Sequence, residues 1–122
     1  MLLQKISNKT ISDERGTFSN LITFGVWKEA NLITSKAGTV RGNHYHVKAT
    51  EVFIILDGEV EVYLQKVENG KNIGEIERHV VKGGDVFLIK PYINHTFFVK
   101  KDSKWINLLS ELFDKDDFLR AT

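Results

Sequence analysis

Histidine and carboxylate side chains with the spacing of a metal site are concentrated near the middle of the sequence. His44 and His46 are two residues apart, so on a β-strand both side chains leave the same face, and Glu51 follows five residues later. His95, in the second half of the chain, supplies a candidate fourth ligand. Imidazole and carboxylate groups together bind divalent ions. The pattern therefore predicts a metal site at these four residues, although two histidines on one strand are also common as ordinary surface residues.

The elements that would position these residues are short β-strands separated by turns. Residues 52–56 form an apolar run, and residues 59–64 alternate between polar and apolar side chains, as a strand with one face in water does. Asp57-Gly58 between them predicts a hairpin turn, because glycine accepts the positive φ that tight hairpins need. Asn69-Gly70 predicts the next turn. Further strands are expected at 76–81, 86–89, 96–99 and 105–109, with weaker candidates at 21–27 and 29–34.

Many short strands with glycine-containing turns indicate an all-β sandwich or barrel. The tail, residues 114–120, is expected to form a short helical turn or a loop. The length of 122 residues fits a single domain covering residues 1–122, since domains typically have about 100–150 residues.

Composition excludes several classes of function. The net charge is only +1, which gives no electrostatic footprint for a nucleic acid or an anionic membrane. The chain has no cysteine, so disulfides, thiolate metal sites and cysteine nucleophiles are excluded. No apolar run approaches the roughly 20 residues of a membrane span, and the first residues turn polar too soon for a signal peptide. A cytoplasmic protein is therefore expected.

The spacing of glycine, histidine and glutamate resembles the first motif of the cupin family without a departure. The fixed positions are Gly38, His44, His46, Glu51 and Gly58. The second cupin motif is matched less well. Gly84 and His95 keep its separation, but Pro91 is one place late, and Tyr92 and Val99 stand where the family often has glycine and asparagine. The resemblance implies a single small jelly-roll cupin β-barrel, in which the three histidines and the glutamate point inward to hold zinc, manganese, iron or nickel.

A second resemblance is to cupins that act on sugar nucleotides. Residues 13–18 have the sequence Asp-Glu-Arg-Gly-Thr-Phe, and residues 41–44 have the sequence Arg-Gly-Asn-His. Both segments are similar to dTDP-4-dehydrorhamnose 3,5-epimerases. Together with the trailing segment 113–118, they are closer still to the C-terminal cupin domain of bifunctional capsular polysaccharide assembling enzymes. The likeness extends from about residue 13 to 118, although Arg41 stands where the capsular enzymes are expected to have lysine.

The resemblance implies an epimerase or ketoisomerase of nucleotide-linked 4-keto-6-deoxy sugars in surface polysaccharide biosynthesis. A base removes the acidic proton beside the ketone. Return of the proton then gives either a C3 or C5 epimer or a 3,4-ketoisomer. In metal-free relatives the histidine matching His44 is this base, and the one matching His46 can assist. A histidine nitrogen that binds metal cannot act as a base, so the metal site favoured here leaves a metal-bound water, Tyr45, Tyr63 or Tyr92 as acid and base. Tyr92, next to Pro91 at the expected barrel mouth, is the best proton donor among the tyrosines.

Substrate-binding residues and partners follow from the same resemblance. Arg15 and Arg41 are expected to bind the phosphates of the nucleotide sugar, and Asn43 to orient a ligand. The family also implies a homodimer, and a separate reductase is a candidate partner. Two other functions stay open from the sequence. A site of three histidines and one glutamate that holds iron suits a metal-dependent dioxygenase, and the same barrel serves as a non-catalytic sugar-binding or metal-binding module.

Overall fold

A computed structural model describes all residues 1–122, and strands make up most of the chain. Two long antiparallel strands, β6 (Glu51–Glu68) and β9 (Ile93–Leu109), form the centre of a seven-stranded sheet. The other strands of this sheet are β1 (Leu3–Lys5), β4 (Glu29–Ser35), β5 (Val40–His44), β7 (Lys71–Lys82) and β8 (Val86–Ile89). The one helical element is the 3-10 turn η1 (Lys115–Asp117). No helix is long and apolar enough to cross a membrane.

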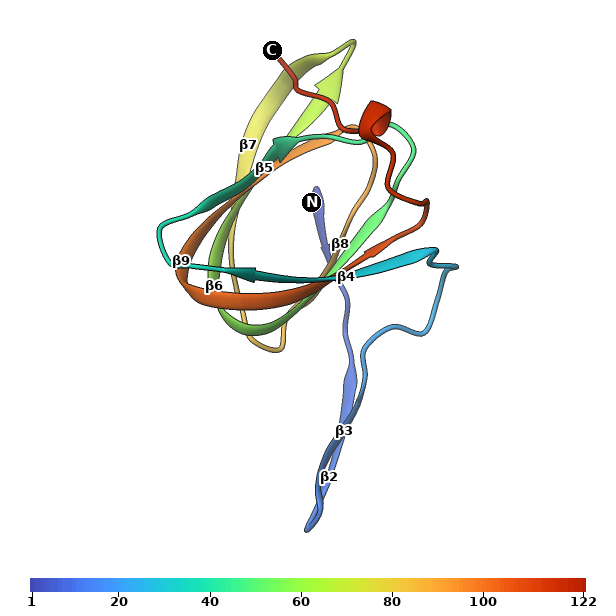
Figure 1. Ribbon diagram of the computed structural model, residues 1–122, viewed down its shortest axis with the longest axis vertical. Helices are drawn as coiled ribbons and strands as arrows, with labels where there is room; N and C mark the ends of the chain where they lie inside the picture. The colour runs from blue at the N-terminus through green and yellow to red at the C-terminus, as the bar shows by residue number, and fades with distance from the viewer.

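The large sheet folds over on itself because its two central strands change partners midway. The first residues of β6, 51–54, pair with β8, whereas residues from 59 onward pair with β7. Both halves also pair with β9, with irregular register between residues 55 and 60. The two halves therefore face each other as layers around an interior, which Figure 1 shows as a ring of strands. The predicted all-β fold is confirmed.

The core fills one part of this interior with alternating side chains from the central strands. Val60, Val62 and Leu64 on β6 are completely buried, while the residues between them face outward, as a period of two requires. Trp105 and Phe97 from β9 meet them, with ring centroids 5.6 Å apart. Burying a large apolar side chain contributes roughly 1.5–3 kcal/mol, so this cluster holds the two layers together.

Three sequence predictions differ from the structure. Asp57-Gly58 does not form a hairpin, because β6 continues through it, with irregular register against β9 between residues 55 and 60. Glycine is still required there, since Gly58 has a φ of 105°. Residues 21–27 form an irregular loop in which the Trp27 indole donates to the carbonyl of Phe24. The strands expected at 96–99 and 105–109 are parts of the single strand β9. The turn at Asn69-Gly70 is confirmed and joins β6 to β7.

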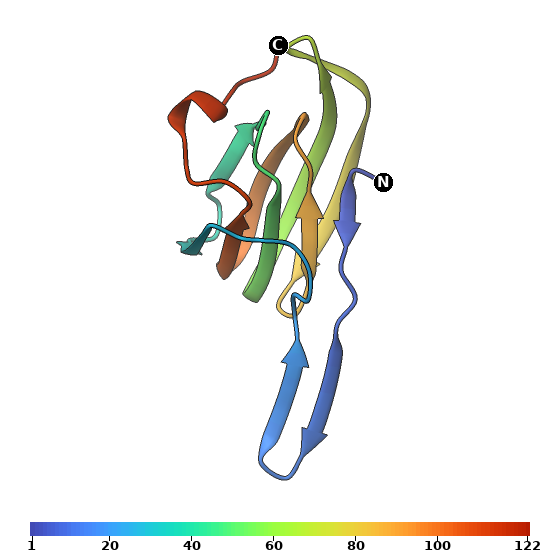
Figure 2. The ribbon, with the colours of Figure 1, turned by 90° about the vertical axis from the view of Figure 1, so that its right-hand side faces the viewer.

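A separate two-stranded hairpin was not expected from the sequence. It consists of β2 (Lys9–Asp13) and β3 (Gly16–Asn20) and projects from the body of the molecule, as Figure 2 shows. Ile11 and Phe18 are paired across its strands, and both side chains are largely exposed.

The close packing around Gly58 predicts that a side chain there destabilises the protein by more than the cost of its positive φ alone. Gly58→Ala is expected to lower the free energy of unfolding more than Gly74→Ala. Both glycines have positive φ, which costs other residues on the order of 1–2 kcal/mol. Only at Gly58 would a new Cβ lie 2.6 Å from the Cα of Ser103, and overpacking of this kind adds about 1–3 kcal/mol. Urea unfolding of the two variants measures the difference, and equal losses would contradict the close approach.

Candidate functional site

The four side chains expected to bind metal meet at one end of the interior. His44 ends β5, His46 follows that strand, Glu51 begins β6 and His95 lies near the start of β9. One nitrogen or oxygen atom from each of them lies within 4.8 Å of those of the other three. His46, Glu51 and His95 are buried, and His44 is half-buried. Residues up to 51 positions apart in sequence therefore form a single cluster.

Strand pairing explains this convergence. His44 and His95 are cross-strand neighbours on β5 and β9. The chain stays extended past the end of β5, because Tyr45 forms a bridge with Leu119, so His44 and His46 share one side of the strand. Gly42 allows β5 to approach β9 closely, since a Cβ there would lie 2.7 Å from the carbonyl oxygen of His95.

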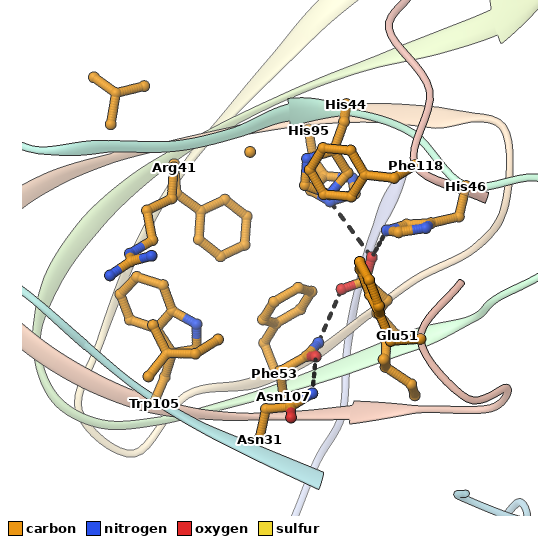
Figure 3. A pocket seen from close by; sticks show the side chains of 16 residues that line it. Asn31, Arg41, His44, His46, Glu51, Phe53, His95, Trp105, Asn107 and Phe118 are labelled. Carbon is orange, nitrogen blue, oxygen red and sulfur yellow. Dashed lines mark hydrogen bonds and ion pairs between the residues drawn. The ribbon is translucent and has the colours of Figure 1, made fainter. Parts of the chain in front are cut away.

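A cavity of about 350 Å³ opens beside the cluster, and half of its lining residues are hydrophobic. Figure 3 shows His46 and Glu51 on one side of this cavity and Arg41 on the other. The Arg41 guanidinium is held in place by donating from Nε to Ser35 Oγ at 2.7 Å and from Nη2 to the carbonyl of Thr34 at 2.9 Å. The cavity thus has a fixed cation opposite the histidine cluster, with an apolar wall between them.

The carboxylate of Glu51 is divided between two kinds of partner. Its Oε2 accepts a hydrogen bond from Asn107 Nδ2 at 2.9 Å. Its Oε1 lies 2.6 Å from Nε2 of His46 and 3.5 Å from Nε2 of His95. One oxygen is therefore fixed by an amide, and the other faces two imidazole nitrogens.

The contact between His46 and Glu51 requires a hydrogen on the imidazole nitrogen that faces the carboxylate. His46 Nδ1 lies 2.6 Å from the main-chain carbonyl oxygen of Asp117, and a carbonyl only accepts, so Nδ1 must carry a hydrogen. In neutral imidazole the Nε2 atom then has only a lone pair, which would face a carboxylate oxygen at 2.6 Å. A proton between them removes this repulsion. A divalent ion bound by both atoms would require them to move more than about 3 Å apart, because each metal–ligand bond is about 2.0–2.2 Å long. His44 Nδ1 is also buried without a hydrogen-bond partner. The donor set and its unpartnered atoms fit a divalent ion.

Burial and mutual charge shift the pKa values of the cluster in different directions. Burial, aided by the nearby charges of His95 and His46, lowers the pKa of His44 to about 3. Burial also lowers the pKa of His95. For His46 burial opposes the charged form, but the contact with Glu51 outweighs it and raises the pKa. The pKa of Glu51 is lowered, because the neighbouring histidines outweigh its burial. At neutral pH, His44 is therefore a neutral imidazole.

Three residues predicted to act in the site do not line this cavity. The side chain of Arg15 lies on the projecting hairpin, where it pairs with Asp13 at 2.7 Å. Asn43 has a positive φ of 61° at the bulge in β5, and its side chain lines a groove on the outer face of the sheet. Tyr92 has a φ of 62° at the turn before β9 and lies next to Tyr45, with ring centroids 6.3 Å apart. In each case a local turn or bulge directs the residue away from the cavity.

Two residues that the sequence prediction missed contact the cluster. Asn107 is an amide at an inward position of β9, between the inward residues Trp105 and Leu109. A lone polar residue in such an alternating run is the signal that could have identified it. Asp117 is buried in the C-terminal turn and contacts His46. No local pattern indicates its role, because its partners are about 70 residues away in the sequence.

Comparisons with known proteins identify similar folds. Residues 11–118 match the family described as the polysaccharide biosynthesis C-terminal domain. The sugar 3,4-ketoisomerase QdtA from Thermoanaerobacterium thermosaccharolyticum, solved in complex with TDP, is 26% identical, with a TM-score of 0.79 over 98% of this chain and 88% of that chain. The epimerase RmlC from Legionella pneumophila Philadelphia 1, in complex with dTDP-4-keto-L-rhamnose, is 20% identical, with a TM-score of 0.81 over 95% of this chain and 70% of that chain.

A third similar structure is NovW, a 4-keto-6-deoxy sugar epimerase from the novobiocin gene cluster of Streptomyces spheroides. It is 19% identical, with a TM-score of 0.80 over 94% of this chain and 66% of that chain. At these identities the two epimerases establish a shared fold, which is the RmlC-like cupin barrel expected from the sequence. No curated protein sequence matches the chain.

The lowered pKa of His44 predicts how stability depends on pH in the presence of a chelator. The folded imidazole protonates near pH 3 and the unfolded one near about 6.5, so the unfolded chain binds more protons between these values. Acidification from pH 7 to pH 5 should therefore lower the free energy of unfolding, and His44→Asn should reduce this dependence. Urea unfolding at several pH values measures it, with His79→Asn, outside the cavity, as the control. Equal pH dependence in both variants would contradict a buried neutral His44.

Proposed function

Because the chain belongs to the polysaccharide biosynthesis C-terminal domain family, we propose that it is an epimerase or ketoisomerase that acts on a nucleotide-linked 4-keto-6-deoxy sugar. The observation that carries this proposal is the cavity itself, which has a buried cluster of histidines on one side and Arg41 on the other. The similarity to a sugar 3,4-ketoisomerase over nearly the whole chain supports the same class of enzyme.

The cavity suits a sugar joined to a diphosphate. The fixed guanidinium of Arg41 can bind a phosphate through two parallel hydrogen bonds. Arg41 and the cluster line the same cavity of about 350 Å³, so a sugar joined to that phosphate would face the histidines. Apolar residues such as Ile33 and Phe97 line the space between, and they suit the methyl group of a 6-deoxy sugar. In this orientation the ketone side of the sugar faces the histidines.

Proton transfer beside the ketone falls to the cluster or to a water molecule in the cavity. Apart from Arg41, the only titratable side chains that line the cavity are His44, His46, Glu51 and His95. His44 is neutral there and is stacked in the wall under Phe118, so it is available as the base when no metal is bound. Return of the proton to the opposite face of the same carbon gives an epimer, and return to C4 gives a ketoisomer.

We also propose that His44, His46, Glu51 and His95 hold one divalent ion, for which zinc, manganese, iron and nickel are all suitable. When bound, such an ion would polarise a ketone oxygen and stabilise negative charge that develops on it. Asn107 leaves Glu51 Oε1 free for the ion by occupying Oε2. The nitrogens that bind the ion cannot act as bases, so a water molecule in the cavity would then move the proton.

A homodimer and a separate reductase partner stay predictions. The projecting hairpin offers exposed Ile11 and Phe18 to a second copy of the chain. Because Arg15 does not line the cavity of its own chain, a contact between this side chain and substrate phosphates would have to occur in the cavity of that second copy.

The proposed reaction predicts exchange of hydrogen beside the ketone. Incubation with dTDP-4-keto-6-deoxyglucose and related keto sugars in D₂O should introduce deuterium at C3 or C5 if the protein is an epimerase, and at C4 of the 3-keto product if it is a ketoisomerase. Mass spectrometry and NMR detect the label. In metal-free protein, His44→Asn should slow this exchange by about 10²- to 10⁴-fold, the usual contribution of a general base, while His79→Asn should leave it unchanged.

Several outcomes would contradict the proposed reaction. Absence of exchange with every such sugar would rule it out. Oxygen consumption with bound Fe(II) and no exchange would indicate a dioxygenase. Ligand-induced stabilisation without turnover would indicate a binding module.

The proposed metal site predicts about one divalent ion per chain in protein purified without chelator or affinity nickel. Elemental analysis should find this ion in the unmodified protein and in a His79→Ala control, and should not find it in a His44→Ala, His46→Ala double variant. Absence of metal from the unmodified protein would contradict the metal site while leaving the epimerase proposal intact, since both histidines would then be free to act as acid and base.

A further inference from the structure

The carboxylate of Asp117 holds the loop between His46 and Glu51. Its Oδ1 accepts hydrogen bonds from the main-chain N–H groups of Val47 at 2.7 Å and Lys48 at 2.9 Å. Its Oδ2 accepts from the N–H of Ala49 at 3.1 Å. Only 5% of the residue is exposed. A buried carboxylate with three N–H donors is strongly fixed, so the loop that links two members of the cluster is anchored to the C-terminal turn.

The main chain of the same residue orients His46. The carbonyl oxygen of Asp117 lies 2.6 Å from His46 Nδ1, and it can only accept. This contact keeps a hydrogen on Nδ1 and directs Nε2 toward Glu51 Oε1, 2.6 Å away. Asp117 Oδ2 is also 3.6 Å from Nδ1, which adds negative charge behind the ring. A hydrogen bond of this kind behind an imidazole fixes its tautomer and makes the opposite nitrogen a better ligand.

The next two residues extend the contact to the rest of the strand that carries the histidines. The Phe118 ring is stacked on the His44 ring, with centroids 3.8 Å apart, and Figure 3 shows it beside the cluster. Leu119 and Tyr45 exchange two main-chain hydrogen bonds of 2.9 and 3.0 Å. The C-terminal segment therefore contacts both histidines of β5 and its extension, from outside the barrel strands.

We propose that Asp117 is a positioning residue of the reaction centre, which fixes His46 with its hydrogen on Nδ1 and its Nε2 toward Glu51. The carboxylate anchors the loop 47–49, and this anchoring holds the carbonyl of the same residue against the imidazole. The consequence for catalysis rests on the proposed function, because the cluster is where the ketone would react. The orientation of His46 itself does not depend on that function.

Two substitutions of different severity test this role. Asp117→Ala removes all three hydrogen bonds to the loop. Asp117→Asn is gentler, since an amide oxygen at the Oδ1 position still accepts from Val47 and Lys48, while an NH₂ group would face the N–H of Ala49. Asp116→Ala is the matched control, because Asp116 is the exposed neighbour in the same turn. If Asp117→Ala does not fold, Asp117→Asn provides the test.

The first measurement follows the His46 ring directly. In metal-free protein with ¹⁵N-labelled histidine, NMR should detect a slowly exchanging hydrogen on His46 Nδ1 at pH 8. This signal should persist in Asp116→Ala, and it should exchange faster or disappear in the Asp117 variants. The second measurement is the affinity for Zn²⁺ by competition with a chelator. It should fall by about 10- to 100-fold in Asp117→Ala, as is typical when a partner behind a ligand is removed, and by less in Asp117→Asn.

The outcomes separate this proposal from the proposed function. An unprotonated Nδ1 on His46 in the unmodified protein would overturn the positioning role. So would Asp117 variants that are less stable but keep the Nδ1 hydrogen and the Zn²⁺ affinity, because they would show a purely structural residue. If the unmodified protein binds no Zn²⁺, the proposed metal site fails, and the NMR signal alone decides the role of Asp117.

Discussion

The continuous pairing of β6 with β9 is the constraint on which the rest of the structure depends. Both strands run through both layers of the barrel, so their register sets which residues meet in the interior. The register is irregular between residues 55 and 60, near Gly58, and the two strands pair again on both sides of this stretch. As a result the first residue of β6, Glu51, faces the same space as His95 near the start of β9, although the two lie at different ends of the paired strands. A shift of register by one residue would turn these side chains outward.

The polar end of the interior must compensate for the cost of burying charge. A carboxylate removed from water is costly unless hydrogen bonds and opposite charges surround it. Glu51 meets this requirement through Asn107 and two histidines, and Asp117 meets it through three main-chain N–H groups. Two atoms of the cluster, His44 Nδ1 and Glu51 Oε1, are buried without a hydrogen-bond partner. The hydrogen bonds that compensate for the burial of these carboxylates therefore also hold the histidines of the cluster in place.

The two sides of the cavity differ in chemistry, because different strands line them. Apolar side chains from the central strands close its middle, the histidine cluster lies on one side and Arg41 on the other. This arrangement suits a ligand whose anionic group binds Arg41 and whose reactive carbonyl, on the other side of a ring, faces the histidines. The C-terminal segment completes the wall, since Phe118 stacks on His44. The barrel strands alone would leave this side of the histidines uncovered.

The sequence by itself determined the all-β class and the grouping of His44, His46 and Glu51, because strand periodicity and short spacing are local properties of the chain. His95 lies 44 residues after Glu51, and the resemblance to the second cupin motif supported its place in the group. It also identified Arg41, which lines the cavity. The structure placed Arg15, Asn43 and Tyr92 outside that cavity, because positive φ values and the projecting hairpin change side-chain direction in ways that motif spacing does not encode. Asp57-Gly58 became part of the continuous strand β6 and not a turn because the partner strand continued beside it. Only the tertiary structure brought Asp117 to His46, since contacts between segments about 70 residues apart depend on how the whole chain packs.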